Sequence, residues 1–165
     1  MSSTHPTGRS SIESVIDALR SRKPEVAERL CREHLQASPA SIEHLRFLGH
    51  ALMQQRRFDE AEAKFRNALG LAPDFAPLME DLGSALAQQR KFDDAILQFE
   101  QAVAHDAELV NAYKKLGQSL AALGRGDEAD DAFRIFFDKN PDVGAVAIGA
   151  DHMRAGRIET AIDSA

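Results

Sequence analysis

The feature that most constrains this chain is a period of 34 residues. Glycine recurs at this interval at residues 49, 83 and 117, and phenylalanine at residues 65, 99 and 133. Ala61, Ala95 and Ala129 keep the same interval, as do Leu52, Leu86 and Leu120. Within each period, apolar residues recur every three or four residues in two stretches, which is the helical spacing. Each period therefore predicts two short amphipathic helices, and neither helix can bury its apolar face without neighbours.

The segment from Ile42 to Phe75 shows the pattern most fully. It resembles one unit of the tetratricopeptide repeat family, a helix–turn–helix of 34 residues. The matching residues, in the order of the family's motif, are Leu45, Leu48, Gly49, Leu52, Ala61, Phe65, Ala68 and Pro73. The resemblance implies an all-α protein, a right-handed α-solenoid of stacked antiparallel helix pairs.

The repeat frame divides the chain into a disordered N-terminus and five units. Residues 1–7 are predicted to be disordered, and the repeat domain occupies 8–165. Its units are expected at 8–41, 42–75, 76–109, 110–141 and 142–165, with the last one truncated. Turns are expected near 21–24, 54–58, 88–92, 122–126 and 154–157. The first unit is read as a degenerate cap, because terminal repeats face water on one side.

Two further features of the repeats lead to expectations. Ala107 stands where other units have a proline that stops the second helix, so a longer helix is expected there. The last residue of each turn is basic and an acidic residue follows two positions later, as in Arg57 and Asp59. We interpret these charges as partners of the helix dipoles, with the cation at a helix C-terminus and the anion at the next N-terminus.

Composition excludes several classes of function. The formal net charge of −6 argues against a phosphate-binding surface, so no nucleic-acid partner is expected. The N-terminus lacks the apolar stretch of a secretory signal, and no uncharged run is long enough for a bilayer. We therefore expect no membrane contact and a cytoplasmic location. Cys31 is the single cysteine, so an intramolecular disulfide is impossible.

No pattern in the sequence indicates catalysis. The six histidines do not form a ligand set with metal-binding spacing, and the HExxH, CxxC, P-loop and GxSxG motifs are all lacking. Cys31 occupies a packing position of its unit, where a structural thiol is expected rather than a nucleophile. The sequence thus predicts no catalytic residue, no metal and no cofactor.

The resemblance places one face of each first helix on the concave side of the stack, where family members bind proteins or peptides. Carried over position by position, the partner-binding residues are Arg46, Phe47, His50, Met53, Glu80, Asp81, Ser84, Asn111, Lys114, Lys115 and Gln118. We expect a partner segment with an apolar anchor near Phe47 and an acidic group near Lys114 or Lys115. The alternative for Phe47 is that it covers the neighbouring unit.

One branch of the family, the cochaperones of heat-shock proteins, grips a C-terminal carboxylate with basic and amide side chains. The matching positions here are Arg46, His50, Asp81, Asn111 and Lys115. Asp81 would repel a carboxylate and Asn111 removes a positive charge, so this clamp is not expected.

The leading interpretation is a non-catalytic interaction module, a scaffold or adaptor. The alternative is an N-terminal targeting or oligomerisation segment of a larger enzyme such as a sulfotransferase or glycosyltransferase. A third reading is a spacer that binds nothing specific. The truncated fifth unit leaves Ile158, Ala161 and Ile162 on an uncovered face, through which self-association is expected.

Overall fold

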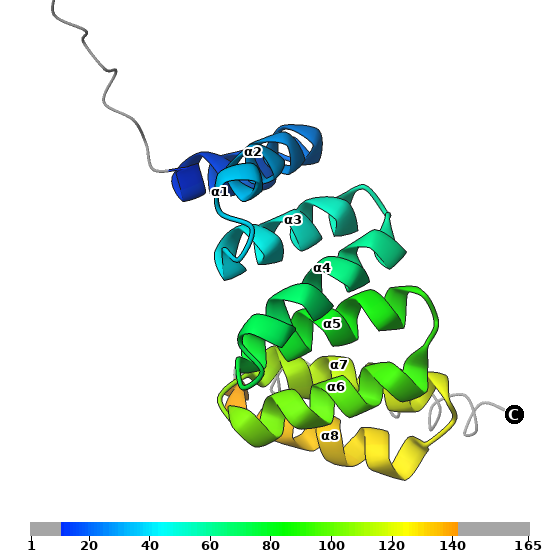
Figure 1. Cartoon of the computed structure of the whole chain (residues 1–165). Coiled ribbons are helices and arrows are strands. Elements are labelled where there is room, and N and C mark those ends of the chain that lie inside the picture. Colours follow the sequence, from blue (N-terminus) through cyan, green and yellow to red (C-terminus); the bar gives the residue numbers. More distant parts are fainter. Residues whose placement is uncertain (1–10, 142–165) are drawn as a thin grey trace, which may run out of the picture.

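The computed structural model describes residues 11–141, which form helices arranged in antiparallel pairs along a single stack (Figure 1). The helices are α1 (Ser11–Arg20), α2 (Pro24–Ala37), α3 (Ile42–Gln54), α4 (Phe58–Leu71), α5 (Ala76–Gln88), α6 (Phe92–His105), α7 (Val110–Ala122) and α8 (Gly126–Lys139). No strand occurs within residues 11–141. The predicted all-α solenoid is confirmed.

The turn inside each pair has the same backbone conformation in the four units within residues 11–141, beginning with Arg22 at a φ of 54°. Arg56 and Arg90 adopt positive φ angles of 61° and 62°, and Gly124 takes their place in the next unit with a φ of 75°. The amide of Arg57 donates to the carbonyl oxygen of Leu52 at 2.9 Å, which closes a Schellman-type turn. These turns lie where the sequence predicts them, while the turn expected near 154–157 lies outside the described residues.

The basic residues of the turns do not lie at helix C-termini, so their interpretation as dipole partners is wrong. They are the N-cap residues of the second helices: Lys23, Arg57, Lys91 and Arg125. A cation at a helix N-terminus meets the unfavourable end of the dipole. Ion pairs with carboxylates compensate for this at three of the four positions: Arg57 pairs with Glu28 and Glu60, Lys91 with Glu62, and Arg125 with Glu128.

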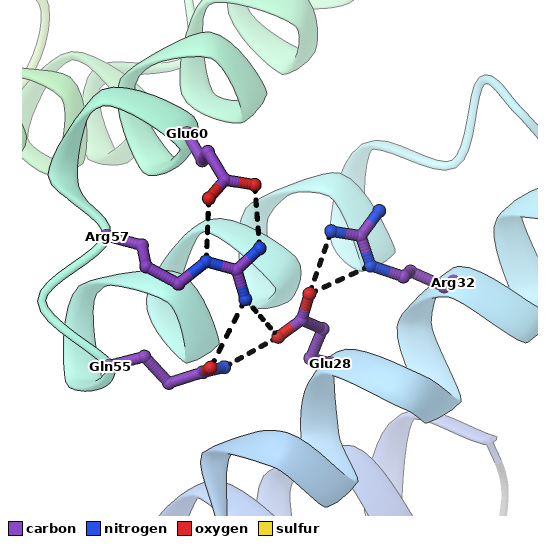
Figure 2. A network of polar contacts seen from close by, with 5 residues as sticks. All are labelled: Glu28, Arg32, Gln55, Arg57 and Glu60. Carbon is purple, nitrogen blue, oxygen red and sulfur yellow. Dashed lines mark hydrogen bonds and ion pairs between the residues drawn. The ribbon is translucent and has the colours of Figure 1, made fainter.

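Figure 2 shows such a set of contacts, which joins the first unit to the second. Glu28 on α2 accepts hydrogen bonds from Gln55 and Arg57, both at 2.7 Å, and from Arg32 at 2.9 Å. Arg57 also donates to both carboxylate oxygens of Glu60, at 2.6 and 2.7 Å. Burial raises the pKa of Glu28, but the hydrogen bonds from Gln55 and Arg32 and the charge of Arg57 outweigh it, so the pKa lies below its ordinary value. The carboxylate is held ionised between two units.

The same contacts recur between the second and third units, 34 residues later. Glu62 accepts from Gln89 at 2.6 Å and from Lys91 at 3.0 Å. The pattern ends at the next junction, where Ile96 stands at the glutamate position and Leu123 at the glutamine position. The third and fourth units therefore meet without the carboxylate that links the earlier ones.

The second, third and fourth helix pairs are held together internally by a contact between glycine and phenylalanine. Phe65 and Phe99 are fully buried. A Cβ atom on Gly83 would lie 2.7 Å from Cε1 of Phe99, far closer than carbon atoms pack, and a Cβ on Gly49 would clash with Phe65 in the same way. The 34-residue spacing of glycine and phenylalanine therefore records a close approach of the two helices in each pair.

The expectation of a longer helix before Ala107 is wrong. Helix α6 ends at His105 and has 14 residues, like α4, which is followed by a proline. The side-chain oxygen of Asp106 accepts a hydrogen bond from the amide of Glu108 at 2.9 Å. This local bond favours a turn and replaces the proline as the stop signal.

The first unit is joined to the second through a buried histidine. His44 on α3 is 2% exposed and occupies the position that Leu78 holds one unit later. Its ring stacks on His34 with centroids 3.6 Å apart, and the hydroxyls of Ser11 and Ser41 lie 3.0 and 2.9 Å from its two nitrogens. The cap is thus fastened by a polar side chain at a core position. Residues 1–7 and the fifth unit at 142–165 lie outside the described residues.

Because His44 is buried, we expect the free energy of unfolding to fall in mild acid. Burial lowers the pKa of His44 below its ordinary value of 6.5, and the charge of His34 adds to the effect. The His44 imidazole therefore binds a proton more readily in the unfolded chain than in the folded chain. As a result, the free energy of unfolding falls as the pH drops through about 6.5. Thermal unfolding followed by circular dichroism at several pH values measures this slope. The variant His44→Leu should flatten the slope, whereas His105→Leu, at an exposed site, should not. An unchanged slope in His44→Leu would contradict the account.

Candidate functional site

The predicted partner-binding residues lie on α3, α5 and α7, the first helices of three consecutive units. First helices approach one another along the stack, since α1 contacts α3 and α5 contacts α7. No contact of similar extent joins two second helices among the described residues. The first helices therefore line the inner side of the array. We call the surface formed by their side chains that point away from the core the inner face.

Three of the predicted residues form an ion pair cluster between α3 and α5. Nε of Arg46 lies 2.5 Å from Oδ2 of Asp81, and Nε2 of His50 lies 3.2 Å from the same oxygen. Burial raises the pKa of Asp81. The hydrogen bonds and charges of His50 and Arg46 lower it by more than burial raises it, so the pKa of Asp81 lies below its ordinary value. Asp81 thus pairs with Arg46 and His50 within the chain, so all three side chains are occupied at the surface where a partner was expected.

A second contact joins α5 to α7. Nζ of Lys115 lies 2.6 Å from a carboxylate oxygen of Glu80 and donates to the hydroxyl of Ser84 at 2.9 Å. An ammonium group has three N–H donors, so one of them remains for another acceptor. The inner face thus carries charges of alternating sign, as the sequence predicts, but these charges pair with one another across units.

The remaining predicted residues divide into packed and exposed side chains. Phe47 and Met53 are half-buried and pack against the core. Asn111, Lys114 and Gln118 on α7 are exposed. Whether any of them contacts a partner stays a prediction, and the exposed side chains of α7 are the ones that a partner can reach.

A hollow of about 270 Å³ lies between α5 and α7, with the start of α6 behind it. We call it the inner groove, and its principal lining residues are Ser84, Gln88, Phe92, Phe99, Lys115 and Gln118. Three of these six, Ser84, Lys115 and Gln118, are among the residues predicted from the sequence. The hollow combines amide, hydroxyl and ammonium groups with two aromatic rings.

Two contributors to this face are not among the predicted site residues. Phe92 is the first residue of α6, and the family pattern assigns second helices to the outer side. Phe75 precedes α5 and is 41% exposed, with the guanidinium of Arg46 lying 5.7 Å from the centre of its ring. A large aromatic residue at a turn position, where packing does not demand one, is the sequence signal that would have indicated Phe75.

The chemistry available within residues 11–141 is limited. No group of three or more His, Cys, Asp or Glu side chains there is arranged to hold a metal ion. Cys31 is buried, and burial raises the pKa of its thiol to about 12, so the reactive thiolate is suppressed. Among the same residues, no helix has the length and apolar character needed to cross a membrane.

A family model described as tetratricopeptide repeat matches the chain over residues 13–76, 47–108 and 80–142. These three overlapping matches cover most of the chain. The chain belongs to the tetratricopeptide repeat family. The observed 34-residue units, with their glycine–phenylalanine contacts, are therefore tetratricopeptide repeats, and membership supports a role as a protein-interaction scaffold.

Solved structures of similar fold agree with this assignment. A crystal structure of MamA superposes with a TM-score of 0.74 at 19% identity, over 82% of this chain and 79% of that chain. A second MamA structure gives 0.72 at 24% identity, over 79% and 72%. An O-GlcNAc transferase mutant from Thermobaculum terrenum gives 0.64 at 24% identity, over 67% of this chain but 21% of that chain. At these identities the likeness shows the fold alone. No curated protein matches the chain in sequence.

The cluster around Asp81 predicts a structural role for a residue expected at the partner surface. Asp81→Asn removes the charge that Arg46 and His50 share, and should lower the free energy of unfolding by about 1.5–3 kcal/mol. Urea unfolding measures the loss. The matched control is Asp74→Asn, in the exposed turn before α5, which should stay within about 0.5 kcal/mol of the parent. If Asp81→Asn is as stable as the parent, the structural role is wrong and Asp81 stays a candidate for binding a partner.

Proposed function

We propose that this chain is a non-catalytic adaptor whose inner groove holds an extended segment of a partner protein. The observation that carries the proposal is the hollow between α5 and α7, where polar side chains surround an aromatic floor. It lies on the inner face, which the packing of the first helices leaves open. Tetratricopeptide membership supports a protein partner in general, and the groove suggests where this one docks.

The size of the inner groove favours a side chain over a small-molecule ligand. Its volume of about 270 Å³ lies below the range of roughly 300–1,000 Å³ typical of cofactor and drug sites. One or two side chains of a peptide fill such a volume. Phe92, which is half-buried, supplies the apolar surface against which they would pack.

The polar groups around the groove suit a peptide backbone. Gln88 and Gln118 are exposed, and each amide side chain can donate and accept, as a peptide bond requires. The remaining N–H of Lys115 suits a carbonyl or carboxylate oxygen. The acidic group expected in the partner would then lie near Lys115, since the ammonium of Lys114 lies 5.9 Å from the centre of the Phe136 ring on α8.

The test is to select peptides on the wild-type chain from a displayed random library and to measure each enriched peptide against two variants. Gln88→Trp fills the groove from its exposed rim and should weaken binding about tenfold or more, which is ~1.4 kcal/mol. Gln101→Trp makes the same change at an exposed position on α6 and should leave affinity unchanged. Expected affinities are micromolar, roughly −8 kcal/mol.

Both variants should melt at the temperature of the parent, because both positions are exposed. Peptides that bind Gln88→Trp as tightly as the parent would show that the inner groove is not the docking site. A selection that enriches no peptide would count against peptide recognition altogether.

A further inference from the structure

The net charge of the chain is concentrated on two outer helices of its second half. Helix α6 has three acidic residues and no lysine or arginine, and α8 has five acidic residues and two basic ones, so each carries −3. Helices α2 and α4 each have three acidic and two basic residues, a net of −1. The formal charge of the whole chain is −6. The outer face of the third and fourth units is therefore strongly acidic, although the first two units are nearly balanced.

This acidic face contains a groove with an apolar floor. A hollow of about 250 Å³ lies between α6 and α8 over α7, and we call it the outer groove. Leu116 and Leu120 of α7 form its floor, and Ile135 of α8, 37% exposed, lines its side. Carboxylates line the same hollow: Glu100 from α6, and Glu128 and Asp131 from α8.

The chain contains a matched groove of opposite charge. Between α2 and α4, over Leu45 and Leu48 of α3, lies a hollow of about 350 Å³ lined by Arg32 and Lys64. Glu100 occupies, two units later, the position of Arg32. The same scaffold thus tolerates either sign, so the helix packing does not require the acidic residues of the outer groove.

The carboxylates of the outer groove are available to a partner. Glu128 pairs with Arg125 and Asp131 with Arg134, each three residues apart on the surface, at 2.6 and 2.8 Å. These side chains are 40–69% exposed, and exposed pairs of this kind contribute little to stability. Cations of a partner can replace them at small cost.

We propose that the outer groove docks a basic amphipathic segment of a partner protein. Apolar side chains of the segment cover Leu116, Leu120 and Ile135, while its lysine or arginine side chains meet Glu100 and Asp131. Charge complementarity selects this occupant, because an acidic segment, a nucleic acid or an anionic membrane would be repelled. The site is separate from the inner groove, so the chain offers two docking faces.

The test uses three fluorescent peptides of about four helical turns. The first presents leucines at helical spacing flanked by arginines, the second replaces the arginines by glutamates, and the third scrambles the first. Fluorescence anisotropy with the full chain at physiological ionic strength measures their affinity. The first peptide should bind most tightly, and the second should not bind.

Two pairs of variants locate the site. Glu100→Arg should weaken binding of the first peptide about tenfold. Glu33→Arg makes the same change at an exposed position on α2 and should leave this affinity unchanged. Ile135→Ser should weaken it severalfold, whereas Leu71→Ser, at an exposed position on α4, should not. Gln88→Trp should leave this affinity unchanged, which separates the outer site from the inner groove.

Three results would overturn the proposal. If the scrambled peptide binds as tightly as the first peptide, binding comes from diffuse attraction to an acidic surface and not from docking in the outer groove. Loss of binding in Gln88→Trp would place the peptide in the inner groove. No measurable binding of the first peptide at millimolar concentration would leave the outer groove without the stated partner.

Discussion

In the second, third and fourth units, the structure depends on the contact between a glycine of the first helix and a phenylalanine of the second helix. The ring occupies the space that a Cβ atom would take, so the two helices approach more closely than any other residue at the glycine would permit. Phe65 and Phe99 are thereby buried completely, and each pair becomes a rigid unit with apolar faces above and below. A single pair cannot cover both faces, and stacking the next pair buries one of them.

Because the contact between the helices is the same in the second, third and fourth units, the surface side chains can vary. The first two junctions share a glutamate, Glu28 or Glu62, that accepts hydrogen bonds from the next turn, and the third has Ile96 in its place. The positions of Arg32 and Glu100 are equivalent, yet they line grooves of opposite charge at the two ends of the outer face. On the inner face, Asp81 and Glu80 link successive first helices and leave the groove beside Lys115 as the accessible part. The distinct surfaces of the chain arise where the repeat departs from its own pattern.

The sequence was sufficient for the fold because the 34-residue interval is exact and recurs in residues of unusual shape, glycine and phenylalanine. It located the turns for the same reason. It could not place Arg46 beside Asp81, since these residues are 35 positions apart and their distance depends on the twist between units. Nor could it assign the basic turn residues to helix N-caps, because a shift of two residues in the helix boundary reverses the dipole argument. Asp106 replaced the missing proline through a side-chain bond that the family pattern does not encode. The inner and outer grooves both combine side chains from three helices, which no single motif brings together.

The central claim, that glycine and phenylalanine are coupled by close contact, is tested most directly by a double-mutant cycle in urea. Gly83→Ala should cost about 1–3 kcal/mol by overpacking, although alanine is the better helix former, and Phe99→Leu should also destabilise the chain. Gly70→Ala, with no atom within 4 Å of the added methyl group, serves as the control and should be neutral or stabilising by up to about 1 kcal/mol. The account predicts that Gly83→Ala costs much less in the Phe99→Leu background, because the smaller side chain frees the space. Strictly additive costs, or a Gly83→Ala variant as stable as Gly70→Ala, would contradict it.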